Sequence, residues 1–149
     1  MLIRKLEKKD ETRWRELWDG YCDFYKKELS SARTEYLWQR LMDANSTVHA
    51  IVAVNNDDFV VGIANYIIHE NTSMPTPVCY LQDLFVDSDV RGAGIGRALI
   101  DFLVLEMKSN KWSRLYWHTK ENNYQARQLY DRYTSQSGFL LYGISNEEI

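Results

Sequence analysis

The order of hydrophobic and polar positions predicts one strand and two helices in the first third of the chain. A short apolar run at residues 2–6 is typical of a strand, and Asp10 is then the expected N-cap of an amphipathic helix. Apolar side chains recur at helical spacing in that helix: Trp14, Leu17, Trp18, Tyr21, Phe24 and Tyr25. A second helix is expected from about Thr34 to Met42.

Two strand-like runs follow, at residues 48–54 and 59–68, and they flank the four turn-forming residues 55–58. This arrangement predicts a β-hairpin. Residues 78–87 form the most strand-like segment of the chain, and the loop 88–92 leads from it into a long helix. That helix has Ile95, Ala98, Leu99, Phe102 and Leu105 on one face, and Asn110 is its expected end.

The last part of the chain predicts a strand at residues 114–119, a helix from 123 to about 135 and a strand at 139–144. The order β-αα-βββ-α-β-α-β indicates a mixed α+β sheet with helices on its faces. With 149 residues and no repeat or linker, the chain is expected to be one domain, 1–149.

Composition excludes several classes of protein. The net charge of −3 lacks the basic footprint that nucleic-acid binding requires, so we expect no nucleic-acid partner. No apolar run reaches the roughly 18 residues of a membrane span, and the charged N-terminus lacks the apolar core of a signal peptide. Cys22 and Cys79 are far apart and show no metal or redox spacing. We therefore expect a cytoplasmic protein without a membrane partner and without a metal.

The segment Arg91-Gly92-Ala93-Gly94-Ile95-Gly96 carries the clearest chemical signal, because it lies between a strong strand and a strong helix. Glycines allow positive φ and let backbone N–H groups approach an anion closely. At a helix start these N–H groups lack intrahelical partners and sit at the positive end of the helix dipole. The segment is therefore a candidate phosphate cradle, and the alternative is a glycine-rich turn that only packs a helix on a sheet.

The spacing of this loop separates it from two common phosphate loops. A P-loop requires a Gly-Lys-Ser/Thr ending, and no lysine occurs here. A dinucleotide fingerprint requires Gly-x-Gly-x-x-Gly, which neither Gly92 nor Gly94 begins. The observed spacing is Arg-x-x-Gly-x-Gly, read from Arg91.

Three motifs occur in a fixed order: the strand Leu81-Gln82-Asp83-Leu84-Phe85-Val86, the loop Arg91 to Gly96, and the helix Asn123-Tyr124-Gln125-Ala126-Arg127-Gln128-Leu129-Tyr130. In these motifs the chain resembles the GCN5-related N-acetyltransferase (GNAT) superfamily. It looks closest to the branch of polyamine, histone and D-amino-acid acetyltransferases. The resemblance implies the acyl-CoA N-acyltransferase (GNAT) fold. In that fold about four helices cover a mostly antiparallel, twisted sheet of about seven strands, splayed between its fourth and fifth strands.

The resemblance also implies a binding mode for acetyl-CoA as cosubstrate. Its pantetheine arm is expected along the backbone of Leu84, Phe85 and Val86, with the Leu84 N–H facing the thioester oxygen. The pyrophosphate is expected on the loop and first helical turn, formed by Arg91, Gly92, Ala93, Gly94, Ile95, Gly96 and Arg97. Asn123 is expected to contact the cosubstrate, and Ala126 to leave room for it.

Tyr130 is the expected general acid. A tyrosine pKa near 10 keeps the hydroxyl protonated at neutral pH, so it can donate to a departing thiolate whose thiol has a pKa of about 8.5. The alternative is that Tyr130 belongs to an apolar stripe with Ala126, Leu129 and Tyr133. The acid role follows from its position in the family motif.

The general base stays open at the level of sequence. Gln82 stands where polyamine-acetylating relatives have a glutamate, and an amide cannot take a proton. Asp83 can, but strict strand alternation turns it to the face opposite Gln82 and Leu84, where it could equally be a buried structural carboxylate. His118, on the neighbouring predicted strand, and a water wire are the other candidates.

The acceptor is expected to be a primary amine of a small molecule such as a polyamine or an amino acid, attacked directly in a ternary complex. A protein lysine or N-terminus is the alternative acceptor, and a CoA-binding module without catalysis is the third possibility. The aromatic residues of the first two helices are either core or part of an acceptor site.

Eight residues separate Tyr130 from Gly138, about four more than in the family pattern. Four residues are close to one helical turn, which predicts a longer last helix. The C-terminal segment makes a homodimer a reasonable expectation.

Overall fold

The computed structural model describes all 149 residues, which form two compact units, residues 1–118 and 119–149. The first unit contains β1 (Leu2–Lys5), α1 (Glu11–Phe24), α2 (Ser31–Met42), β2 (Val48–Val54), β3 (Val60–His69), β4 (Val78–Val86), α3 (Ile95–Asn110) and β5 (Arg114–Tyr116). Two short 3₁₀ turns, η1 (Lys8–Asp10) and η2 (Ser88–Val90), precede α1 and α3. The second unit contains α4 (Tyr124–Tyr130).

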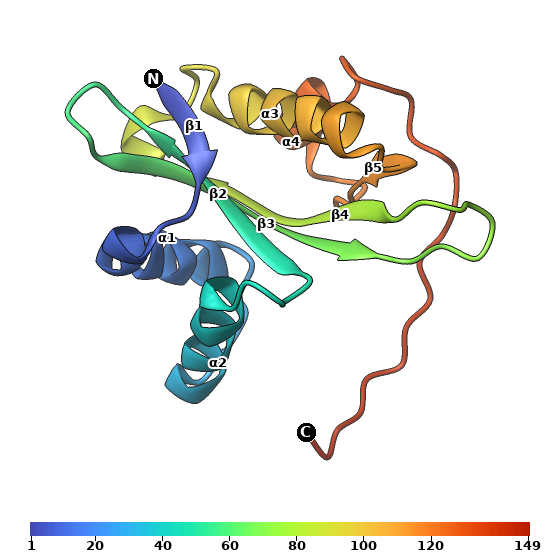
Figure 1. The fold of residues 1–149 in the computed structure, drawn as a ribbon, viewed down its shortest axis with the longest axis horizontal. Helices are drawn as coiled ribbons and strands as arrows, with labels where there is room; N and C mark the ends of the chain where they lie inside the picture. The colour runs from blue at the N-terminus through green and yellow to red at the C-terminus, as the bar shows by residue number, and fades with distance from the viewer. The chain divides into compact units, whose positions relative to one another are not determined.

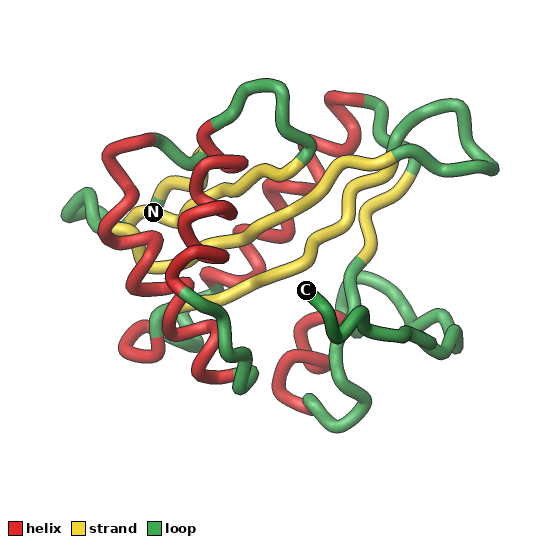
Figure 2. The backbone as a smooth tube through the Cα atoms, turned by 90° about the horizontal axis from the view of Figure 1, so that it is seen from below, coloured by secondary structure: helices red, strands yellow, loops and turns green.

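The strands of the first unit form one sheet in the order β1-β2-β3-β4-β5 (Figure 1). The first four strands pair antiparallel, and β5 pairs parallel with β4. The β4–β5 connection runs through α3, as a parallel connection requires. Figure 2 shows the strands side by side, with helices crossing them. The mixed sheet with helices on its faces that the sequence predicts is confirmed.

The face of the sheet toward α1 and α2 is closed by an aromatic core. Trp14 is fully buried, and its ring lies 5.8 Å from that of Trp18 and 5.4 Å from that of Trp38. Tyr21 continues the stack at 5.2 Å from Trp18. Because these rings pack against β2 and β3 residues such as Ile63, most of the aromatic stripe is core.

The opposite face is covered by α3, whose residues Ile95, Leu99, Ile100 and Leu103 are buried. A Cβ on Gly62 of β3 would come within 2.9 Å of Ile95 Cγ2. The missing side chain at Gly62 therefore lets the first turn of α3 lie directly on the sheet.

Asp10 lies at the N-cap position of α1, as predicted, but its side chain does not cap the helix. Its carboxylate accepts hydrogen bonds from Arg4 Nη1 at 2.8 Å and Nη2 at 2.9 Å, and from the Glu7 N–H at 2.8 Å. Burial alone would raise the pKa of Asp10, but these bonds hold it below its ordinary value. The residue thus anchors β1 to the start of α1.

Three expectations about the end of the chain are wrong. The sheet has five strands, not about seven, and residues 139–144 form none, because no neighbouring strand pairs with their backbone. β5 ends at Tyr116 instead of residue 119. α4 ends at Tyr130 and continues only as a turn, in which the N–H groups of Tyr133 and Thr134 both bond the Tyr130 carbonyl. The extra residues after Tyr130 therefore do not lengthen the helix.

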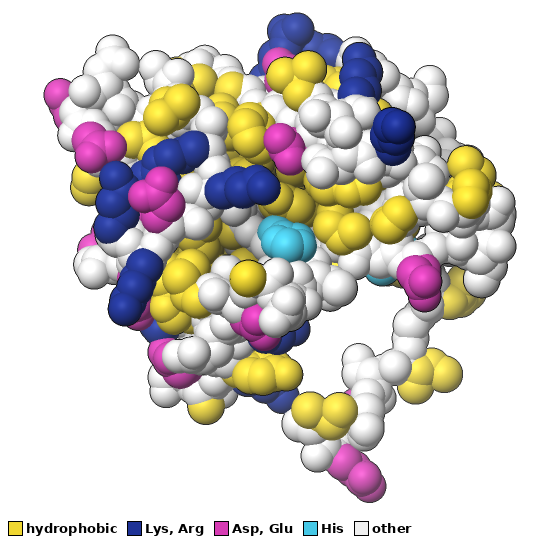
Figure 3. Space-filling view, in the orientation of Figure 1, with side chains coloured by type: hydrophobic (Ala, Val, Ile, Leu, Met, Phe, Trp, Pro, Cys, Tyr) yellow, Lys and Arg dark blue, Asp and Glu magenta, His cyan; other side chains and the backbone are white.

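None of the helices is both long enough and apolar enough to span a bilayer. Acidic and basic side chains are interspersed on the face seen in Figure 3.

Candidate active site

The strand β4 carries an irregularity at the residues predicted to be catalytic. Asp83 pairs with Asn65 of β3, but the next pair is Leu81 with Tyr66. Gln82 is therefore an extra residue, and the register shifts there as in a β-bulge. The bulge breaks the strict alternation from which we predicted that Asp83 and Gln82 face opposite sides. Gln82 is exposed, whereas Asp83 is buried.

Asp83 lies on the face of the sheet covered by α1. Its Oδ2 accepts a hydrogen bond from Asn65 Nδ2 at 3.1 Å, and Asn65 Oδ1 accepts one from Trp14 Nε1 at 3.4 Å. Burial raises the pKa of Asp83, while the neighbouring Tyr21, Asn65 and Lys27 act in the opposite direction. The arrangement combines a structural anchor with a carboxyl group that gains a proton more readily than an exposed one.

The strands β4 and β5 separate after Tyr80, the third of the nine residues of β4. They pair only from Val78 with Arg114 to Tyr80 with Tyr116, while β4 stays paired with β3 as far as Val86. From Leu84 to Val86 the β4 edge away from β3 thus has no strand beside it. Such an edge presents backbone groups that an extended ligand can pair with, as an added strand does.

The glycine loop follows directly. Gly92 and Gly94 have φ values of 86° and 78°, which L-amino acids with side chains rarely adopt. Gly94 is the N-cap of α3, so the first N–H groups of the helix, such as those of Ile95 and Gly96, have no carbonyl one turn earlier in the helix to bond. Apart from the adjacent residues of the chain, nothing lies within 4 Å of the position of a Cβ on either Gly92 or Gly94. The loop therefore offers open space and N–H donors to an anion, which fits a pyrophosphate.

Arg91 links this loop to the open strand edge. Its Nε donates a hydrogen bond to the Val86 carbonyl at 3.0 Å. Its guanidinium lies 5.1 Å from the Phe85 ring centre and 5.5 Å from that of Phe24. Ala93 is exposed between the two positive-φ glycines. The predicted cosubstrate residues on the first unit thus form one continuous stretch from Leu84 to Arg97.

The remaining predicted residues lie in the second unit, on α4. The Asn123 side chain caps this helix by accepting a hydrogen bond from the Ala126 N–H at 3.4 Å. Ala126 and Tyr130 are four residues apart, so they share one side of α4. Tyr130 is the last residue of the helix. Asn123 therefore has a structural role, which sequence reasoning did not foresee.

Neither cysteine is placed for nucleophilic catalysis. Cys22 and Cys79 are buried and free. Burial raises the pKa of the Cys79 thiol to about 12 and also raises that of Cys22. Because the thiolate is the nucleophile, both are poor candidates for an acyl-enzyme. No group of three or more His, Cys, Asp or Glu side chains is arranged to hold a metal ion.

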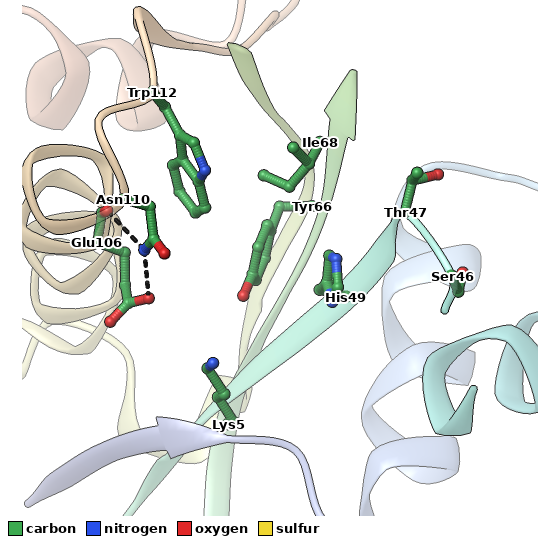
Figure 4. Close-up of a pocket in the computed structure, with 9 residues that line it drawn as sticks. All are labelled: Lys5, Ser46, Thr47, His49, Tyr66, Ile68, Glu106, Asn110 and Trp112. Atoms are coloured by element: carbon green, nitrogen blue, oxygen red, sulfur yellow. Dashed lines mark hydrogen bonds between the residues drawn. The ribbon is translucent and has the colours of Figure 1, made fainter. Parts of the chain in front are cut away.

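A pocket of about 330 Å³ lies elsewhere on the first unit (Figure 4). Lys5, His49, Tyr66, Glu106 and Trp112 are among its lining residues. Tyr66 follows Asn65 on β3, so its side chain lies on the face opposite Asn65 and the bonded Asp83. The pocket is therefore separate from the candidate active site.

Sequence reasoning missed a group of rings at the point where β4 and β5 separate. Tyr80, Tyr116 and His118 gather there with His69, and hydrogen bonds join them in two pairs. The signal available in the sequence was the spacing of Tyr116 and His118, which places both on one face of a strand.

Comparison with known proteins decides the family. Residues 14–134 match the sequence model of the acetyltransferase (GNAT) family. The chain belongs to this family. Because GNAT enzymes use acetyl-CoA as cosubstrate, it is an acetyl-CoA-dependent N-acetyltransferase.

The chain is 27% identical over 143 residues to a D-amino-acid N-acetyltransferase of Saccharomyces cerevisiae, covering 95% of this chain and 89% of that protein. Among solved structures, a ribosomal-protein-alanine N-acetyltransferase from Brucella melitensis biovar Abortus 2308 superposes with a TM-score of 0.80 at 22% identity, over 98% of this chain and 100% of that one. An aminoglycoside acetyltransferase from an uncultured soil metagenomic sample superposes with a TM-score of 0.77 at 21% identity, over 97% of this chain and 96% of that one. These structural similarities establish the fold.

Proposed function

We propose that this GNAT enzyme transfers the acetyl group of acetyl-CoA to a primary amine of a small molecule. The observation that carries the proposal is the open edge of β4 from Leu84 to Val86, which runs directly into the glycine loop. An extended pantetheine arm along that edge would bring the pyrophosphate to the N–H groups at the start of α3. The family match spans residues of both units, which supports one catalytic domain over residues 1–149.

The chemistry that we propose is direct attack. A neutral amine attacks the thioester carbonyl, so the C–N bond forms and the C–S bond breaks. The departing sulfur takes a proton from the Tyr130 hydroxyl, and the proton that the new amide nitrogen loses restores Tyr130 through water. The Leu84 N–H stabilises the negative charge that develops on the carbonyl oxygen. The two buried cysteines support a mechanism without an acyl-enzyme.

Within the class of small amines, we propose an amino acid as acceptor. The yeast relative acts on D-amino acids by its name, and its likeness covers nearly the whole chain. Lys27 supplies a cation near Asp83: it counteracts the rise in the Asp83 pKa, and its Nζ lies 5.2 Å from the Tyr21 ring centre. A cation beside this face suits the carboxylate of an amino acid.

The test is a thiol-release assay of acetyl-CoA against amino acids of both chiralities, their decarboxylated amines, polyamines, aminoglycosides and lysine peptides. We expect turnover on amino acids and a Lys27→Gln variant that raises KM for them but not for the decarboxylated amines. Turnover restricted to peptides would replace the proposal by a protein acetyltransferase. Tight CoA binding without turnover on any amine would leave a CoA-binding module.

We further propose a homodimer and a cytoplasmic location. The unpaired state of both cysteines suits a reducing compartment. Light scattering after gel filtration, and fractionation of cells that make the protein, test the two proposals.

A further inference from the structure

Two tyrosine–histidine pairs lie side by side where β4 and β5 separate. Tyr80 OH is 3.1 Å from His118 Nδ1, and Tyr116 OH is 2.7 Å from His69 Nε2. The two tyrosine rings stack with centres 4.9 Å apart at 17°. The pairs come from β3, β4 and β5 or the residues that follow them (Figure 1). The group therefore depends on the sheet and not on one local segment.

This group lies on the same face of the sheet as Asp83. Tyr80 of β4 pairs with Ile67 of β3, and Asp83 pairs with Asn65. Ile67 and Asn65 are two residues apart on β3, so both pairs lie on one face of the sheet. Tyr116 pairs with Tyr80, and His118 follows Tyr116 by two residues. His118 is therefore the first side chain on this face of the β5 segment beyond the last strand pair, where the open edge begins.

The two histidines differ in their free nitrogen atoms. His69 Nδ1 lies 2.7 Å from the Glu70 carbonyl oxygen, which can only accept, so Nδ1 carries a proton, and His69 Nε2 lies 2.7 Å from the Tyr116 hydroxyl oxygen. Both nitrogens of His69 are thus engaged. His118 is exposed and is bonded only through Nδ1, so its Nε2 is available to a substrate.

We infer that His118 is the general base of the proposed acetyl transfer, and that Tyr80 is the residue that positions it. The inference rests on the proposed function. Nδ1–H of His118 donates to the Tyr80 oxygen, and the lone pair of Nε2 takes a proton from the ammonium group of the acceptor. The neutral amine then attacks the thioester, and exposed His118 returns its proton to water.

Two tyrosine rings contact His118. Tyr80 faces it from β4 and Tyr116 from β5, where their ring centres lie 5.3 Å and 5.9 Å from that of His118. Arg114 lies over the Tyr116 ring at 4.4 Å, and the His69 ring meets the Tyr116 ring edge-on with centres 5.8 Å apart. Burial, then the Asp83 charge and Tyr116, raise the pKa of Tyr80, which keeps its hydroxyl protonated as a hydrogen-bonding partner.

The first experiment measures kcat/KM for the acceptor against pH. The wild type should have an acidic limb, on which activity falls as pH is lowered because a protonated base cannot accept a proton, whereas His118→Gln should lack this limb and lose about 100-fold in kcat/KM at pH 7.5. KM for acetyl-CoA should stay within about threefold, since the loss concerns the base. His69→Gln is the matched control and should keep the limb and the rate. An unchanged limb in His118→Gln overturns the inference, whereas a wild type without turnover on any amine overturns the proposed function itself.

The second experiment does not depend on turnover. ¹⁵N NMR should show neutral His118 protonated at Nδ1, and Tyr80→Phe should shift it to the Nε2-protonated form while lowering kcat and leaving KM for acetyl-CoA unchanged. A wild-type His118 protonated at Nε2, or a Tyr80→Phe enzyme with wild-type kcat, overturns the positioning role.

Discussion

Asn65 donates a hydrogen bond to Asp83 over 3.1 Å, directly beside the β-bulge at Gln82. The bond holds the register of β3 and β4 where the chain inserts its extra residue. It also places a carboxyl group under α1, where burial raises the pKa of Asp83. Burying this carboxylate therefore costs stability at neutral pH, and the Asn65 hydrogen bond offsets part of that cost.

Replacing Asp83 by asparagine should stabilise the protein at pH 7. Folding raises the pKa of Asp83. The contribution of this group to stability is therefore fully present below the pKa of an unfolded aspartate, and it is lost as pH rises through the pKa of Asp83 in the folded protein. Asp83→Asn cannot ionise and can still accept from Asn65. We expect its free energy of unfolding to exceed that of the wild type by about 1 kcal/mol at pH 7, with a smaller difference at pH 4.

Urea unfolding at the two pH values measures this difference. Asp57→Asn, which removes the same charge from an exposed turn, is the control and should show no such pH dependence. A less stable Asp83→Asn protein at pH 7 would contradict the prediction. It would mean that the hydrogen bonds and the nearby cation more than offset the cost of burying the Asp83 carboxylate.

Tyr130→Phe should lower kcat by a factor of about 100 or more and leave the Kd of CoA within about threefold. The phenylalanine keeps the ring at the end of α4 and removes only the proton donor. Tyr124→Phe, at the first residue of the same helix, is the matched control and should keep wild-type kcat. Single-turnover kinetics with CoA titration separate the two quantities, and equal losses in both would remove Tyr130 from the acid role.

Local patterns predicted most of the fold. The stripe of α1, the β2–β3 hairpin, the strand β4 and the start of α3 all follow from neighbouring residues, so they could be located without a partner. Residues 139–144 also have the apolar run of a strand, but they form none, because a strand exists only where another strand completes its hydrogen bonds. The number of strands was therefore beyond sequence reasoning.

The site divides in the same way. The cradle of Gly92 and Gly94 was predictable, because the demand for positive φ lies within the loop itself. The burial of Asp83 was not, since it depends on a register shift between two strands. The ring pairs of Tyr80 with His118 and of Tyr116 with His69 were equally hidden, because partners more than 35 residues apart meet only in the sheet.

Gly94→Ala should weaken both the fold and the binding of CoA. At φ 78° an alanine is strained by about 1 kcal/mol, and its Cβ enters the open space at the start of α3. We expect the free energy of unfolding to fall by a comparable amount. We also expect the Kd of CoA, measured by titration calorimetry, to rise tenfold or more. Gly143→Ala is the control, since a Cβ there also meets nothing within 4 Å and no positive φ opposes it. Unchanged CoA affinity in Gly94→Ala would exclude the loop as the pyrophosphate site.

The Arg4–Asp10 ion pair should make the protein sensitive to acid. Two hydrogen bonds from Arg4 and one from the Glu7 N–H oppose the effect of burial and lower the pKa of Asp10. The stability that they contribute is therefore present above the pKa of an unfolded aspartate, about 3.9, and is lost as pH falls through the lower folded value.

Asp10→Asn should thus lose about 2 kcal/mol of unfolding free energy at pH 7, and the difference from the wild type should shrink as pH falls below about 4. Glu7→Gln is the matched control, because Glu7 is half exposed and lies 3.9 Å from Arg4, so its loss should stay below about 0.5 kcal/mol. Denaturant unfolding from pH 7 to pH 2.5 measures both. A constant difference between Asp10→Asn and the wild type over this range would mean that the contact acts through packing rather than through the charge of Asp10.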